Sequence, residues 1–189
     1  MSNISLPEYS LIFLSIVIGY IVTVSMVGWG KQIKYFNYPD FSFVHLIWTI
    51  NLFLYLLFIW FWTYSFHLAY LETFLWFTLI LARPLLIYFC YEVLLPEHQE
   101  KVDYVANFSD ARRKFFILLT ILWVYELLLS MLMRLNLFSM RGELVMINIP
   151  ISFSLIFIKK DFTIKILSVI VLVIMLLFLV AHIWMQQLR

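Results

Sequence analysis

Long apolar segments alternate with short polar stretches along the whole chain. A helix needs about 20 mostly apolar residues to cross a hydrocarbon core roughly 30 Å thick. The pattern predicts an all-α, polytopic membrane bundle that forms one transmembrane domain over residues 1–189. Six segments approach the required length, and each predicts a transmembrane helix: 9–30, 43–66, 72–95, 114–133, 139–158 and 163–185.

The fifth segment is shorter than the other five. Between Glu143 and Lys159 it has only 15 uncharged residues, which is about 22 Å of helix. Pro150 interrupts this stretch. The segment is therefore either a kinked span, with Arg141 reaching toward the interface, or a re-entrant segment.

Composition agrees with a membrane location and narrows the chemistry. The chain is 65% apolar, 20% aromatic and 13% charged, whereas about a quarter of the residues in a soluble domain are charged. A net charge of +2 gives no reason to expect nucleic-acid binding. Cys90 is the single cysteine, so a paired-cysteine redox or zinc motif is excluded. No histidine spacing matches a helical metal motif, and we expect neither a metal nor a cofactor.

The basic residues predict the orientation of the helices. With the N-terminus outside and six spans, nine of them fall on one side, against three outside (Arg134, Arg141 and Arg189). The positive-inside rule makes the richer side cytoplasmic. A loop over 97–110 is expected there, with Asp110 as the N-cap of the fourth helix. The nine basic residues are Lys31, Lys34, Lys101, Arg112, Arg113, Lys114, Lys159, Lys160 and Lys165.

Arg83 followed by Pro84 lies in the middle of the third apolar segment. An arginine at the centre of a membrane helix costs roughly 2.5–3.5 kcal/mol on insertion scales, so a partner is expected. Glu126 in the fourth segment lies at a depth that differs from that of Arg83 by about 4–5 Å. Because the two helices are antiparallel neighbours, the sequence predicts an Arg83–Glu126 ion pair. Pro84 is expected to free the carbonyl of residue 80 and to bend the helix.

Three interpretations of this polar site remain open. The pair is a structural clamp between two helices, a gated or proton-coupled site, or two charges with different neighbours. Glu92 lies nine residues after Arg83, about half a turn away on the helix, and therefore cannot share its partner. Near the cytoplasmic interface, Glu92 is either a solvated carboxylate or the inner mouth of a proton path.

The second segment carries Trp48, Asn51, Tyr55 and Trp62 on one helical face. Such a face is typical of contact with protein rather than lipid. The simpler interpretation is interhelical packing with one hydrogen-bonding asparagine. In the alternative, Asn51 lines a pore that also reaches Arg83.

Two further groups of residues follow helical spacing. Asn148 and Ser152 flank Pro150 in the fifth segment and form a candidate broken-helix site of the kind found in transporters, although a simple proline kink is commoner. In the first segment Ser15, Gly19 and Thr23 recur every four residues. A stripe of small residues allows close helix packing, either within the chain or between protomers.

The first 135 residues also resemble a known group of proteins. The segments that carry the resemblance are the Trp-rich second helix with His45, Trp48, Trp60 and Trp62, the third-helix sequence Ala82-Arg83-Pro84-Leu85-Leu86, and the fourth-helix sequence Asp110-Ala111-Arg112-Arg113-Lys114-Phe115-Phe116. These resemble a widespread family of small six-helix bacterial membrane proteins without an assigned activity. The resemblance implies six spans and a location in the bacterial inner membrane, and it implies no functional residue.

Three functions are consistent with the sequence. The first is a small ion- or proton-conducting channel or transporter, expected to be a homo-oligomer in the lipid bilayer. The second is a non-catalytic membrane subunit or scaffold whose cytoplasmic loops dock a partner protein or anionic lipid. The third is a membrane enzyme that acts on lipid. An enzyme is the least favoured, because no motif of an intramembrane protease, lipid transferase or kinase is present.

Overall fold

The protein is a bundle of long helices. The computed structural model describes residues 5–34, 42–66, 73–95, 103–133, 140–158 and 160–187, with one helix in each of these ranges. All six expected helices are therefore confirmed. Their bounds are α1 Leu6–Lys34, α2 Phe43–Phe66, α3 Phe74–Leu94, α4 Tyr104–Leu132, α5 Met140–Phe157 and α6 Asp161–Gln187.

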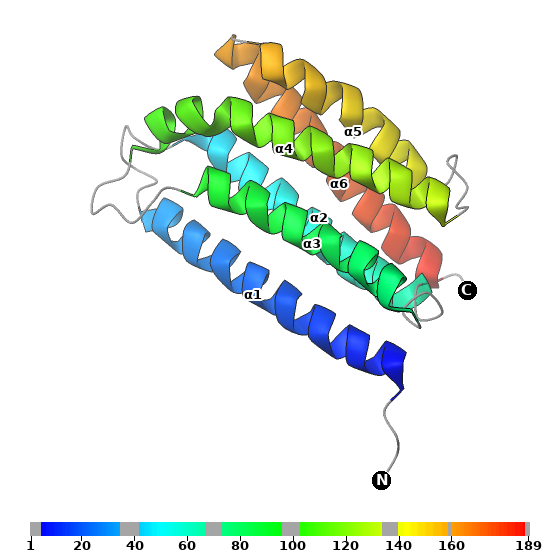
Figure 1. The fold of residues 1–189 in the computed structure, drawn as a ribbon. Helices are drawn as coiled ribbons and strands as arrows, with labels where there is room; N and C mark the ends of the chain where they lie inside the picture. The colour runs from blue at the N-terminus through cyan, green and yellow to red at the C-terminus, as the bar shows by residue number, and fades with distance from the viewer. Residues whose placement is uncertain are drawn as a thin grey trace.

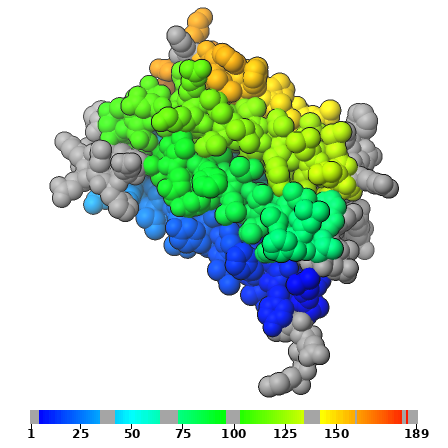
Figure 2. Space-filling model, viewed as in Figure 1, coloured from blue at the N-terminus to red at the C-terminus, as the bar shows by residue number. Residues whose placement is uncertain are grey.

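The helices run up and down, so that α2, α4 and α6 begin at the end of the bundle where α1, α3 and α5 finish (Figure 1). Helix α2 lies centrally and packs against α1, α3, α4 and α6, whereas α5 packs on α4 and α6. No residue of α2 is Asp, Glu, Lys or Arg, so this helix can be surrounded by other helices without burying a charge. Seen from one side, α1, α3, α4 and α5 form a broad face (Figure 2).

Five of the six helices are long and apolar enough to cross a membrane. The exception is α5, which has 18 residues and an apolar part limited to Gly142–Phe157. The expectation of six full spans is thus confirmed for five helices only. Outward-facing apolar side chains are abundant on the bundle, and Phe74 and Leu75 are 81% and 67% exposed. Large apolar side chains in such positions are what a lipid-facing surface requires.

Helix α4 begins ten residues earlier than predicted, and Asp110 is not its N-cap. Asp103 has that role, because its Oδ1 accepts the backbone N–H groups of Val105 and Ala106, both at 2.9 Å. The added turns bury Tyr104 and Phe108, whose rings lie 5.3 and 6.4 Å from the imidazole of His45. Packing against α2 therefore extends α4 into a stretch whose polar residues predict a loop.

Candidate functional site

The Arg83–Glu126 ion pair is confirmed. The Nε–H of Arg83 donates to Oε1 of Glu126 at 2.6 Å, and both side chains are 0% exposed. Each charge lies in the buried stripe of its helix, because Ile80, Arg83 and Ile87 follow one another at three and four residues in α3. Glu126 continues the stripe of Leu119 and Leu122 in α4 in the same way. Apolar periodicity thus turns both charges toward the α3–α4 contact.

Residues of α2 complete the surroundings of the guanidinium. The Cζ atom of Arg83 lies 5.1 Å from the ring centroid of Trp62, a cation–π distance. The Tyr55 side chain also interacts with Arg83. Among the described residues, however, neither Nη1 nor Nη2 of Arg83 has a partner with hydrogen-bond geometry. The guanidinium is therefore charge-compensated while two of its nitrogens remain without a strong acceptor.

A second polar contact joins α3 and α4 beside the ion pair. The Tyr125 hydroxyl donates to the backbone carbonyl of Leu79 at 2.6 Å. This carbonyl precedes that of Ile80, which lacks its usual helical donor because Pro84 has no N–H. The two contacts come from adjacent residues of α4, Tyr125 and Glu126, so together they fix how far α4 can slide or rotate along α3.

Asn51 lies on the buried face of α2, as its spacing with Trp48, Tyr55 and Trp62 indicates; all four side chains are buried. A space of about 10 Å³ lies beside Asn51 and is also lined by Trp48, Tyr55 and Trp123. Within the described part of the chain, the Asn51 amide and both indole N–H groups have no hydrogen-bond partner. Tyr55 lines this space and also interacts with Arg83. The space beside Asn51 is therefore next to the Arg83–Glu126 ion pair.

Glu92 lies apart from this cluster. Its side chain is exposed and lies near that of Tyr88, one turn earlier in α3. Arg83, by contrast, is fully buried on the α4 side of the same helix. The structure therefore separates Glu92 from the ion pair.

The residues around Pro150 lie in a continuous helix rather than a broken one, since α5 runs without interruption from Met140 to Phe157. Asn148 and Ser152 are both 1% exposed on its buried face. The Asn148 amide donates to the Leu144 carbonyl at 2.8 Å. Its side-chain oxygen and the Ser152 hydroxyl have no partner among the described residues.

Two of the three residues of the small-residue stripe of α1 face outward. Gly19 and Thr23 are exposed, and a Cβ atom added to Gly19 would meet nothing within 4 Å. The close approach of α1 occurs instead at Gly28, where an added Cβ would lie 2.5 Å from Cδ2 of Leu95. Gly19 itself therefore has no close neighbour inside the chain among the described residues.

Sequence reasoning missed a polar junction at the end of α3. The Leu94 carbonyl lies 2.6 Å from Nε2 of His45 and accepts the Asn107 amide at 3.0 Å. Nearby, the Tyr91 hydroxyl donates to the Thr49 carbonyl at 2.8 Å. The last carbonyls of a helix have no hydrogen-bond donor within the helix itself. A search of the other helices for polar side chains at the depth of Leu94 would have pointed to His45 and Asn107.

These features define a class. The protein is a multi-pass helical membrane protein with a buried arginine–glutamate ion pair between two adjacent helices. Among the residues that the structure describes, no group of three or more His, Cys, Asp or Glu side chains is placed to hold a metal ion. No protein-family model, curated protein or solved structure matches the chain.

Proposed function

We propose that the protein is a non-catalytic membrane subunit or scaffold, in which the Arg83–Glu126 pair specifies how the helices pack. The observation that carries this proposal is the complete burial of both charges in a direct 2.6 Å contact. A conducting site needs water or an ion at the charged group, whereas these two groups neutralise each other away from solvent. Buried ion pairs contribute little net stability and can instead fix a unique arrangement, the role proposed here.

The membrane arrangement is part of the proposal. We place the end where α2, α4 and α6 begin on the cytoplasmic side of a bacterial inner membrane, with the N-terminus outside. Support comes from the basic residues at this end, with Lys31 and Lys34 in the last turn of α1 and Arg112 and Lys165 in the early turns of α4 and α6. In this arrangement α5 is a sixth, shorter span. The family resemblance remains a prediction that no comparison tests.

We further propose that α1 mediates contact between copies of the chain. Its stripe of Ser15, Gly19 and Thr23 leaves Gly19 open to the outside. The hydroxyls of Ser15 and Thr23 bond to carbonyls of their own helix, at 2.6 and 2.9 Å, so they add no unsatisfied polar group to such a surface. Small residues that face outward in a membrane helix permit close approach of a second helix.

A pathway for ions or protons is the second candidate function. The observation that favours it is the group of buried polar atoms without partners, the two Nη atoms of Arg83 and the side-chain amide of Asn51 among the described residues. A conformation that admits water to these atoms would satisfy them. Glu92, exposed near the cytoplasmic end of α3, would then lie at the inner mouth.

Flux through liposomes separates the two functions. Purified protein is reconstituted, and uptake of protons, K⁺, Na⁺ and Cl⁻ is compared with that of empty vesicles. The scaffold proposal expects no flux above the empty-vesicle level for wild type or for Glu126→Gln. Flux that is present in wild type and changed in Glu126→Gln would overturn it in favour of the pathway. Arg113→Gln, an exposed position on α4, serves as the control substitution.

A further inference from the structure

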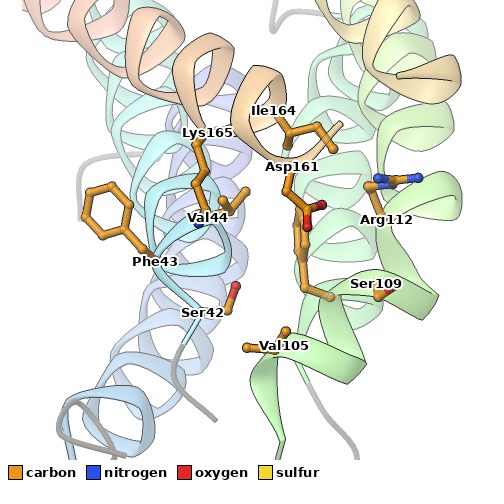
Figure 3. A pocket seen from close by; sticks show the side chains of 10 residues that line it. Ser42, Phe43, Val44, Val105, Ser109, Arg112, Asp161, Ile164 and Lys165 are labelled. Carbon is orange, nitrogen blue, oxygen red and sulfur yellow. The ribbon is translucent and has the colours of Figure 1, made fainter. Parts of the chain in front are cut away.

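A cavity of about 280 Å³ opens between the first turns of α2 and α6 and the early part of α4 (Figure 3). Its polar lining consists of Ser42, Ser109, Arg112, Asp161 and Lys165. These residues come from three distant parts of the sequence. Among the described residues, Arg112, Asp161 and Lys165 form no ion pair, so the cavity presents two cations and one anion that are not paired with one another.

The hydroxyl groups add donors to this cavity. The Ser42 Oγ accepts the backbone N–H of His45 at 3.3 Å, in the position of a helix N-cap. Its own O–H proton is not used in this contact and has no acceptor among the described residues, and the side chain points toward the cavity (Figure 3). Ser109 lines the opposite side from α4. Two hydroxyls, a guanidinium and an ammonium all donate hydrogen bonds, so together they suit an anion with several acceptor oxygens.

The depth of the cavity matches that of a lipid headgroup. In α4 the last charged residue before the apolar part is Lys114, two residues after Arg112, and Glu126 is the next charge. In α6 no charge follows Lys165 as far as Gln187. Both cations therefore lie where the uncharged part of their helix begins, which is the boundary between headgroups and hydrocarbon.

The surroundings of the cavity favour a lipid over a soluble anion. Phe43 and Val105 line it and are 52% and 51% exposed, and the ring of Phe43 points away from the polar side chains (Figure 3). An acyl chain can leave along such a surface. A comparable space of about 350 Å³ at the other end, between α1 and α3, is lined by Leu6, Tyr9, Ser10, Phe13, Thr73, Phe74 and Phe77. None of these seven residues is charged.

We infer that this cavity binds the phosphate-bearing headgroup of a phospholipid. The phosphate contacts Arg112 and Lys165, since a guanidinium and an ammonium are the usual phosphate-binding side chains. Asp161, in the first turn of α6, faces the rest of the headgroup and interacts with its ammonium when the lipid is phosphatidylethanolamine. This inference is independent of the proposed function, because a subunit and a transporter can both carry a bound lipid.

The test measures lipid binding to the intact protein. Delipidated protein in detergent is titrated with phosphatidylglycerol, phosphatidylethanolamine or diacylglycerol, and bound lipid is counted by native mass spectrometry. We expect both phospholipids to bind at least about tenfold more tightly than diacylglycerol, since loss of charge-assisted hydrogen bonds has an effect of this size. Equal binding of diacylglycerol would overturn the inference.

Matched variants locate the site. Arg112→Gln with Lys165→Gln is expected to weaken phospholipid binding about tenfold or more. Arg113→Gln with Lys114→Gln removes the same charge from exposed positions outside the lining and is expected to change it less than about twofold. Equal losses in the two double variants would overturn the site. Size-exclusion elution and thermal stability of each variant establish that it is folded.

Two further arms distinguish the source and orientation of the phosphate. Inorganic phosphate and glycerol 3-phosphate, at the lipid concentration, are expected not to displace the bound lipid; full displacement would make the cavity a small-anion site and overturn the inference. Asp161→Asn is expected to weaken phosphatidylethanolamine relative to phosphatidylglycerol by several-fold, because the carboxylate that interacts with the ammonium is removed. An unchanged ratio would overturn the role of Asp161.

Discussion

The α3–α4 contact and the cavity at the end of the bundle both combine cationic and anionic side chains, with opposite results. Arg83 and Glu126 are fully buried and directly bonded. Arg112, Asp161 and Lys165 line an open space, and these described side chains make no ion pair among themselves. A buried charge must be compensated inside the protein, whereas a charge at the membrane interface can be compensated by water or a ligand. The first arrangement therefore holds helices together, and the second is available for binding.

The largest expected effect follows from removal of one partner of the buried pair. Glu126→Leu leaves the Arg83 guanidinium buried without a counter-charge, which destabilises a protein by about 3–5 kcal/mol. We expect a loss of this size in the free energy of unfolding, measured by denaturation in mixed detergent micelles.

The control for this prediction is the double variant Arg83→Met with Glu126→Leu. Both charges are then replaced by apolar side chains of similar length, so stability is expected to return to within about 1 kcal/mol of wild type or to exceed it. Equal destabilisation of the single and double variants would mean that the two residues are not energetically coupled. The conclusion that the buried pair, unlike the end cavity, holds helices together would then be wrong.

A smaller effect is expected at the second contact between α3 and α4. Tyr125→Phe removes the hydroxyl that donates to the Leu79 carbonyl at 2.6 Å and keeps the ring. The free energy of unfolding should fall by about 0.5–1.5 kcal/mol. Tyr9→Phe, a substitution of the same kind at a ring 58% exposed on α1, should leave it unchanged. A loss larger than that of Glu126→Leu would show that the hydroxyl contact, rather than the ion pair, dominates this interface.

Part of this comparison could be predicted from the sequence, because a charge in an apolar helix is conspicuous. Counting residues from the ends of two adjacent helices placed Arg83 and Glu126 at similar depth, and the buried stripes of α3 and α4 brought them together. The central helix was also predicted with its observed bounds, since 43–66 contains no Asp, Glu, Lys or Arg and lies between the charged residues Asp40 and Glu72.

The rest depends on contacts between distant segments. The sequence predicts Asp110 as the N-cap of the fourth helix, whereas the structure has Asp103, because α4 extends far enough to bury Tyr104 and Phe108 against His45. The end cavity joins Ser42, Arg112 and Lys165, and no local pattern relates them. The outward position of Gly19 likewise depends on which face of α1 packs on α2 and α3. Helical periodicity gives the spacing of such a stripe but not its direction.

The smallest effect on stability is expected at the end cavity, and it sharpens the comparison with the buried pair. Arg112→Gln with Lys165→Gln removes two charges that are at least partly exposed and have no ion-pair partner among the described residues. In detergent without lipid, the free energy of unfolding should change by no more than about 0.5 kcal/mol. With phosphatidylglycerol present, wild type should gain stability through ligand binding, and the double variant should gain less. A large loss without lipid would instead mean that the two cations hold α4 and α6 together, which would make the cavity a structural contact like the α3–α4 interface.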